Sequence, residues 1–163
     1  MTSHKIYARH SGVKECDRLQ IALIKRYIRK TLDFEGVDKP CEVSVLITDD
    51  NGIRRLNHDF RGIDKKTDVL SFPMYVFSPP GWAGSNPGAA EAGTGTIPLG
   101  EIVISAQRVR EQCRGSGRPL DKETAYLTVH SVLHLLGYDH IDEADDKRLM
   151  RAREKKIMIE KSI

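Results

Sequence analysis

The stretch His130-Ser131-Val132-Leu133-His134-Leu135-Leu136-Gly137-Tyr138-Asp139-His140 contains three of the six histidines in the chain. On a helix, His130 and His134 would lie on one face, one turn apart, because four positions separate them. Apolar residues recur at helical spacing over residues 122–136, which predicts that this helix exists. Gly137 then stands where a helix C-cap requires a positive φ, so the chain would turn back sharply there.

The turn at Gly137 would bring His140 to the same point in space as His130 and His134. A histidine pair at this spacing is by itself often only a half-buried helix face, but the third histidine and the glycine favour a metal site. Three imidazoles with an open fourth position are typical of catalytic zinc. We therefore predict one zinc ion per chain on His130, His134 and His140, although nickel or another late transition metal would fit the same ligands.

The spacing H-x-x-x-H-x-x-G-x-x-H also resembles that of the metzincin zinc proteases. Those proteases carry a glutamate directly after the first histidine, and it acts as general base for the zinc-bound water. This chain has Ser131 at that position, and a hydroxyl group is no base at neutral pH. The sequence thus predicts a metzincin-like three-histidine zinc site without the peptidase base, which argues against proteolysis.

The length of 163 residues is most simply explained by one domain over residues 1–163. Charged residues make up 30% of the chain, and the net charge of +3 permits a polyanionic partner without requiring one. No apolar run reaches bilayer length, and the first residues lack the apolar core of a signal peptide. Cys16, Cys41 and Cys113 are interpreted as reduced thiols. We therefore expect a cytoplasmic protein with no membrane partner.

Apolar periodicity and turn residues predict an alternation of strands and helices. Strands are expected over residues 5–9, 42–48, 67–73 and 100–105, and helices over residues 17–32, 53–60, 106–113 and 122–136. Asp17 would be the acid at the start of the first helix, and Asp142 would cap a last one. A mixed sheet of about four strands, flanked by about five helices, would bury its apolar strands on both faces. The fold class is α/β or α+β, which the sequence does not separate.

Two further segments differ from their surroundings in composition. Residues 77–98 are rich in Gly, Pro, Ala and Ser and lack periodic apolar residues, so we expect a flexible surface loop there. This loop is either a lid or an insertion that tolerates sequence drift. The first helix carries a basic face, which is either a solvated helix surface or a contact for nucleic acid. The face consists of Lys25, Arg26, Arg29 and Lys30.

Three stretches resemble the motifs of the YbeY family of metal-dependent endoribonucleases, also called ribosomal RNA maturation factors. Residues 56–73 match the pattern L-N-x-x-[YF]-R-x-x-x-x-x-T-D-V-L-S-F-P, and residues 100–105 match G-[DE]-I-x-I-S. Residues 130–140 match H-G-x-L-H-L-x-G-Y-D-H, apart from Ser131 in place of glycine. Glu101 stands where aspartate is commoner in the family. Neither departure removes a predicted metal ligand.

The resemblance implies a cytoplasmic enzyme that matures the 3′ end of small-subunit ribosomal RNA and takes part in ribosome quality control. It implies a mixed sheet with flanking helices, zinc on the three histidines, and a role for Arg61 in catalysis or RNA binding. The expected partners are single-stranded RNA and the ribosome or its small subunit. Without the resemblance, Arg61 would be interpreted as a surface cation that follows a helix.

The chemistry of these groups suits phosphodiester hydrolysis. A zinc ion acts as a Lewis acid or lowers the pKa of a bound water, and a guanidinium offers a planar fork to two phosphate oxygens. The attacking group is either water or the ribose 2′-hydroxyl. Asp68 and Asp139 are the nearest carboxylates in sequence. Asp139 either orients a ligand histidine or caps the turn that follows.

The hypothesis that follows is a single-strand-specific, zinc-dependent endoribonuclease that acts in ribosomal RNA processing. One alternative is a non-enzymatic ribosome assembly factor in which zinc only stabilises the fold. Another is a zinc-dependent peptidase or amidohydrolase, which the metzincin-like spacing suggests and Ser131 weakens.

Overall fold

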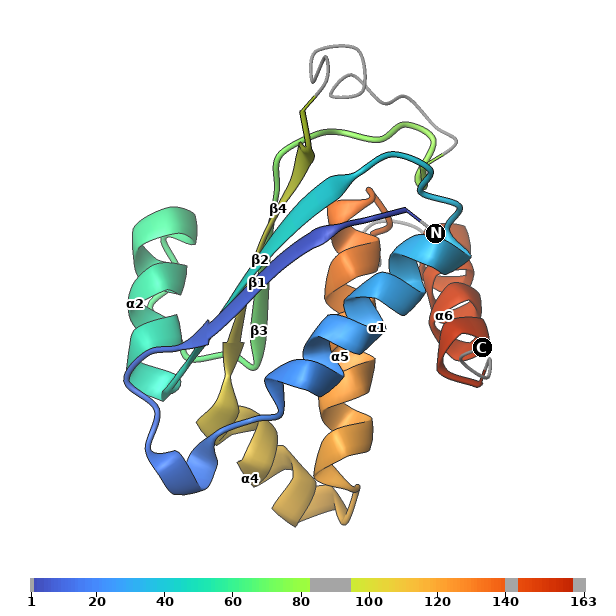
Figure 1. Cartoon of the computed structure of the whole chain (residues 1–163). Coiled ribbons are helices and arrows are strands. Elements are labelled where there is room, and N and C mark those ends of the chain that lie inside the picture. The colour runs from blue at the N-terminus through green and yellow to red at the C-terminus, as the bar shows by residue number, and fades with distance from the viewer. Residues whose placement is uncertain (1, 83–94, 140–143, 160–163) are drawn as a thin grey trace.

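A mixed four-stranded sheet with the order β1-β2-β4-β3 forms the centre of the computed structural model, which describes residues 2–82, 95–139 and 144–159 (Figure 1). The strands are β1 (Lys5–His10), β2 (Cys41–Thr48), β3 (Val69–Pro73) and β4 (Ile97–Ser105). β1, β2 and β4 run parallel, and β3 pairs antiparallel with β4 at one edge of the sheet. The prediction of a mixed sheet of four strands is confirmed.

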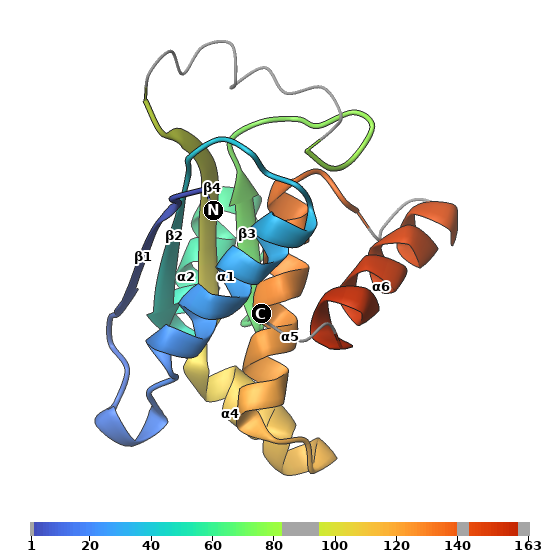
Figure 2. The same cartoon turned by 45° about the vertical axis from the view of Figure 1, so that its right-hand side comes forward.

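The helices lie unequally on the two sides of the sheet (Figures 1 and 2). α1 (Ile21–Phe34) and α5 (Leu120–Leu135) cover one face, and α4 (Ala106–Ser116) and α6 (Ala144–Ile159) pack against α5. α2 (Asp50–Arg61) lies on the opposite face and contacts β3 and β4. The five α-helices of the described residues therefore agree with the predicted number. None of these helices is long and apolar enough to cross a membrane.

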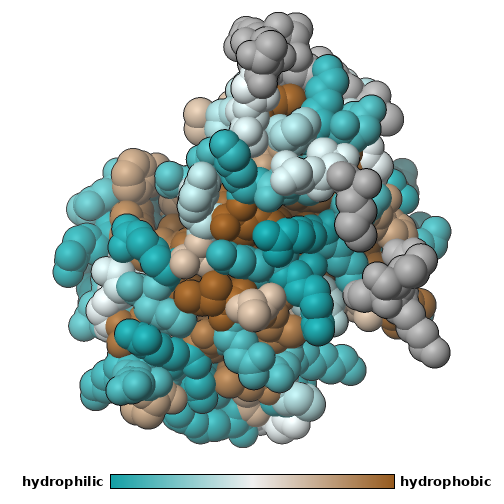
Figure 3. All heavy atoms as spheres, in the orientation of Figure 1, coloured by the Kyte–Doolittle hydropathy of each residue, from teal (hydrophilic) through white to brown (hydrophobic). Residues whose placement is uncertain are grey.

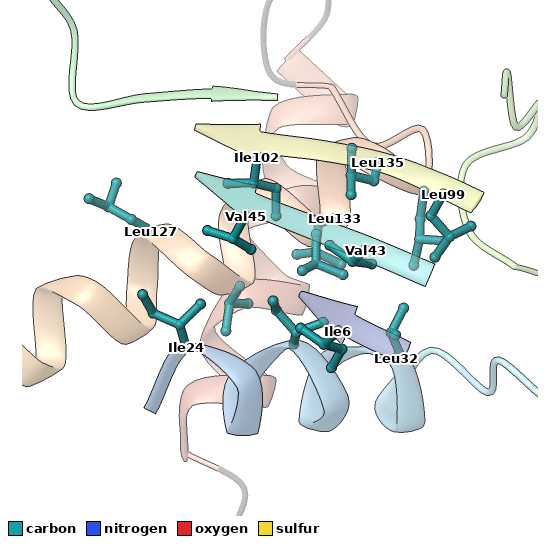
Figure 4. Close-up of a cluster of buried hydrophobic side chains, with 14 of the residues drawn as sticks. Ile6, Ile24, Leu32, Val43, Val45, Leu99, Ile102, Leu127, Leu133 and Leu135 are labelled. Carbon is teal, nitrogen blue, oxygen red and sulfur yellow. The ribbon is translucent and has the colours of Figure 1, made fainter. Parts of the chain in front are cut away.

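The hydrophobic core fills the space between the sheet and the layer of α1 and α5 (Figure 4). Alternate residues of β2 point into it, and Val43, Val45 and Ile47 are buried there. The intervening Ser44 and Leu46 are only half-buried on the other face. The prediction that helices bury both faces is wrong for this part of the sheet, because α2 covers only the half formed by β3 and β4.

The first helix begins later than the sequence predicts. Glu15–Asp17 form a separate 3₁₀ turn, and α1 starts at Ile21. A tertiary contact holds this segment: the guanidinium of Arg110 donates to the carbonyl oxygens of Asp17 and Arg18, at 2.9 and 2.8 Å. The backbone at Arg18 and Gln20 is extended, so the 3₁₀ turn does not continue into α1 and Asp17 does not cap it.

The predicted surface loop over residues 77–98 is too long at both ends. Phe77 and Trp82 are 4% and 9% exposed and belong to the hydrophobic core, and the indole of Trp82 donates to Asp38 at 2.8 Å. Ile97 and Pro98 are already part of β4, where they pair with β2. The remaining part of the prediction concerns residues 83–94, which lie outside the described residues. Asp142, the predicted cap of the last helix, also lies outside them.

Gly100 lies where β3 and β4 approach each other so closely that no side chain fits. Its φ is +146°, and an added Cβ would overlap the carbonyl oxygen of Phe72 on β3. We expect Gly100→Ala to lower the free energy of unfolding by more than about 1 kcal/mol. In Gly115→Ala the new methyl group meets nothing within 4 Å, and this helical position should gain up to about 1 kcal/mol. Urea denaturation of both variants measures the difference, and equal stabilities would contradict it.

Candidate active site

A cleft of about 560 Å³ opens between α5 and the edge strand β3. One wall is the exposed side of α5 with the turn that follows it, and the other is β3 with the end of α2. Residues 75–77, which follow β3, also line the cleft. The lining residues include Arg61, Thr67, Asp68, Ser71, Tyr75, Phe77, His130, His134, Gly137, Tyr138 and Asp139. The cleft thus contains both predicted ligands of α5 together with the predicted catalytic arginine.

The two histidines of α5 point at one place, as their spacing predicts. Their Nε2 atoms are 3.1 Å apart. α5 ends where predicted, because Gly137 has a φ of +93° and the chain closes a Schellman turn with a bond from the amide of Tyr138 to the carbonyl of Leu133. This turn returns the chain to the cleft, where Asp139 lines the wall.

A buried carboxylate orients the first histidine. Glu154 on α6 is 4% exposed, and its Oε1 is 2.6 Å from Nδ1 of His130. Its Oε2 accepts a hydrogen bond from the hydroxyl of Tyr126 at 3.0 Å. Burial and the Glu154 carboxylate raise the pKa of Tyr126 to about 12, so this phenol remains a donor. With Nδ1–H donating to Glu154, the lone pair of His130 is on Nε2, which faces His134.

For the region around Glu154, the sequence predicts only a last helix capped by Asp142, and no role was assigned to Glu154. A signal was present, because Met150, Glu154 and Ile157 recur at helical spacing and form the buried side of α6. A carboxylate on an otherwise apolar stripe requires a partner in the core, and His130 and Tyr126 are those partners.

A second buried contact holds α6 beside Glu154. Arg153 forms an ion pair with Glu35 at 3.1 Å, and the hydroxyl of Tyr138 donates to the same carboxylate at 2.8 Å. Burial raises the pKa of Tyr138. Neighbouring residues of α6 therefore bind the end of α1, the turn after α5 and His130. The position of the His130 ring depends on this docking of α6.

Arg61 lies on the wall that faces the histidines. It is the last residue of α2 and is exposed in the cleft, with Nη1 3.5 Å from Oδ1 of Asn57. Gly62 ends the helix in the left-handed conformation. Asn57 is buried and its side-chain amide donates to the carbonyl of Lys65 at 2.9 Å, which fixes the loop that follows. The backbone that carries Arg61 is therefore an ordered helix end at the cleft.

Two of three further residues have structural contacts that limit their roles. Ser131 is fully buried and donates to the carbonyl of Leu127 at 2.7 Å, so it points away from the cleft. Asp68 lines the cleft, but its Oδ1 accepts from the amide of Val69 at 2.8 Å. Asp139 lines the cleft and is exposed, and its two predicted roles stay predictions.

The third predicted ligand, His140, lies outside the described residues. Among residues 2–82, 95–139 and 144–159 there is no group of three or more His, Cys, Asp or Glu side chains that could hold a metal ion. The three-histidine set therefore stays a prediction, and the structure supplies the geometry of two of its members.

The fold and the cleft define the class: an α/β protein in which a helix-borne histidine pair faces an arginine across a cleft. The family model described as Endoribonuclease YbeY matches residues 7–161. Proteins named Endoribonuclease YbeY from Caldanaerobacter subterraneus subsp. tengcongensis and Caldicellulosiruptor saccharolyticus are 46% and 44% identical to the chain. The alignments cover 84% of both chains in the first comparison and 83% of both in the second. The chain belongs to the endoribonuclease YbeY family.

A solved structure supports the fold independently. The chain is similar to the solution structure of TM1509 from Thermotoga maritima, with a TM-score of 0.57 and 26% sequence identity. The match covers 94% of this chain and 86% of the other. The predicted family is confirmed, and with it the expectation of a family of enzymes.

Glu154 is expected to contribute strongly to stability. In Glu154→Ala the half-buried donors of His130 and Tyr126 lose their acceptor and a cavity is left in place of a buried side chain, so the free energy of unfolding should fall by about 2 kcal/mol or more. Glu111→Ala is the matched control, because it removes an exposed carboxylate whose ion pair with Arg108 is 3.0 Å long. That change should cost less than about 1 kcal/mol. If chemical denaturation gave equal losses in the free energy of unfolding for both variants, Glu154 would contribute no more to stability than an exposed carboxylate.

Proposed function

We propose that the chain is a zinc-dependent endoribonuclease that hydrolyses single-stranded RNA. Its place of action would be the cytoplasm, in 3′ end maturation of small-subunit ribosomal RNA and in ribosome quality control. The observation that carries the proposal is the pair of Nε2 atoms of His130 and His134, 3.1 Å apart in a cleft whose facing wall holds Arg61. The relatives named Endoribonuclease YbeY support the substrate class.

The two described histidines fit a bound zinc ion. Two nitrogen ligands of tetrahedral zinc lie about 3.3 Å apart when each Zn–N bond is about 2.0 Å, and the Nε2 atoms here are 3.1 Å apart. The carboxylate of Glu154 on Nδ1 of His130 is the partner that zinc-bound histidines generally have. We propose His140 as the third ligand, since it directly follows Asp139, which lines the cleft.

The residues of the cleft would divide the work of the reaction. A bound zinc ion supplies Lewis acidity for a phosphate oxygen or a more acidic bound water. The guanidinium of Arg61 would bind phosphate oxygens and stabilise the negative charge that grows on them. Glu154 keeps His130 in one tautomer and orientation. Buried Ser131 offers no base to the cleft, which weighs against the peptidase alternative.

One aromatic side chain of the cleft supports a single-stranded substrate. Tyr75 lines the cleft and is only half-buried, whereas Phe77 and Tyr138 line it but are buried in the core. Bases stack on such rings once they are free of a duplex, and base stacking on aromatic side chains is the usual mode of single-strand binding.

Removal of Arg61 tests the catalytic arrangement. Arg61→Ala should reduce the cleavage rate of end-labelled single-stranded RNA by about 100-fold or more, because one charge-stabilising group is lost. Its zinc content should be unchanged. Arg55→Ala is the matched control, since Arg55 is an exposed arginine of the same helix that does not line the cleft. Equal cleavage by identically prepared wild type and Arg61→Ala would refute the role of Arg61.

Removal of the metal distinguishes a zinc-dependent enzyme from an assembly factor in which zinc only stabilises the fold. His134→Ala should lose most of the one zinc ion per chain and its RNA cleavage, whereas His58→Ala, an exposed histidine of α2, should keep both. Treatment with a chelator should abolish cleavage by the wild type, and added zinc should restore it. Metal analysis and cleavage assays check this. If the chelator lowers only the melting temperature, and the loaded protein never cuts RNA, the zinc is structural.

A further inference from the structure

A groove of about 500 Å³ separates the first half of α5 from the later turns of α6. Figure 2 shows α6 beside α5, and the two helices are in contact. The floor contains Pro119, Tyr126 and Met158. The rim carries four cations: Arg118, Lys122, Arg151 and Lys155. This groove shares no lining residue with the cleft, and of the residues that line it only Tyr126 and Glu154 were described above, as the support of His130.

The groove and the cleft follow one line of side chains on α5. Lys122, Tyr126, His130 and His134 are spaced by four residues, so each lies beside the next in an inclined row that turns by about 120° around the helix from Lys122 to His134. The rings of Tyr126 and His130 are 6.0 Å apart. Lys122 lies twelve residues before His134, which corresponds to about 18 Å along the helix axis. A chain bound in the cleft would therefore reach the groove within several nucleotides.

The charges of the groove favour a polyanion. Its two acidic side chains, Glu123 and Glu154, are buried and bonded to Arg118 and to His130 and Tyr126. The ion pairs found among the described residues leave out the exposed Lys122, Arg151 and Lys155.

The basic face of α1 offers a contrast. Figure 3 shows mainly hydrophilic side chains on this side of the molecule, and Arg26 and Lys30 each lie 5.3 Å from the centre of the Tyr27 ring. Two of its four cations therefore rest on an aromatic ring of the same helix. None of the pockets described for this chain is lined by residues of α1. This face matches the groove in charge but not in shape.

We propose that the groove between α5 and α6 binds the phosphate backbone of the RNA strand whose scissile bond lies in the cleft. This inference rests on the proposed function and extends its substrate site by several nucleotides to one side. Lys122, Arg151 and Lys155 bind phosphates, and Tyr126 and Met158 pack beneath the strand. RNA long enough to span both regions binds more tightly than RNA that fills only the cleft.

Binding of single-stranded RNA of two lengths tests this. The probes are fluorescent oligonucleotides of about 12 and about 4 nucleotides with a 2′-O-methyl, phosphorothioate backbone that resists cleavage. The groove variant combines Lys122→Ala, Arg151→Ala and Lys155→Ala in the zinc-loaded chain. The control variant combines Lys25→Ala, Arg26→Ala and Arg29→Ala on α1, so both lose the same charge. Fluorescence anisotropy gives Kd at several salt concentrations.

The groove variant should bind the longer RNA at least about tenfold more weakly than the wild type and bind the shorter one unchanged. The slope of log K against log salt concentration should be less negative by about 2, because three phosphate contacts are lost and each contributes about 0.7 on a single strand. The control variant should retain most of the affinity and the slope of the wild type.

Equal losses in both variants, or unchanged binding by the groove variant, would overturn the proposal. It would also fail if poly-glutamate of equal charge bound more tightly than RNA, because the groove would then be a site for an acidic protein. The proposed function fails separately: if the wild type shows the length dependence but cuts no RNA, the groove is an RNA site of a protein that is not a nuclease. If the wild type cuts RNA and the groove variant binds normally, only the groove proposal fails.

Discussion

The burial of α5 on nearly all sides is the constraint on which the rest of the structure depends. The helix packs against α1, α4, α6 and the sheet, and ten of its sixteen residues are buried. Such a helix cannot rotate without moving the core, because close-packed interiors tolerate little change in shape. Its one open stripe carries His130 and His134. The direction of the two imidazoles is therefore fixed by the same contacts that stabilise the fold.

The contact between Glu154 and His130 joins that helix to the last one. A carboxylate this deeply buried requires its partners, since an unpaired buried charge costs several kcal/mol. Arg153, the preceding residue, pairs with the buried carboxylate of Glu35 and donates to the hydroxyl of Tyr138. α6 is thus docked by two adjacent polar contacts in addition to its apolar stripe. Loss of either contact would loosen α6 and the orientation of His130 together, so stability and site geometry are coupled here.

Local patterns predicted most of the fold, and tertiary contacts decided the rest. Helical periodicity and Gly137 predicted that His130 and His134 share one face of α5 and that the helix ends at the glycine, because those signals depend only on neighbouring residues. The set of three zinc ligands stays a prediction. The predicted first residue of α1 was wrong. The carbonyls of Asp17 and Arg18 are bound by Arg110, which lies far away in the sequence, so no local pattern could indicate this contact. Phe77 and Trp82 were predicted to lie in a loop, because no periodic pattern of apolar residues surrounds them in the sequence. Glu154 was missed because its partner lies on another helix.

The cleft lies beside the edge strand β3, and this edge position explains why β3 is short, ends in proline and has a carboxylate at its first amide. Edge strands present unpaired amides and carbonyls, which other chains can pair with unless the edge is short, ends in proline or is otherwise blocked. β3 has five residues and ends at Pro73, and the carboxylate of Asp68 accepts from the amide of Val69. Asp68 therefore satisfies a backbone amide of the edge strand, although its place in the cleft suggests a catalytic role. The same open edge gives a long substrate access to the histidines on α5, which a site covered by a further strand would not allow.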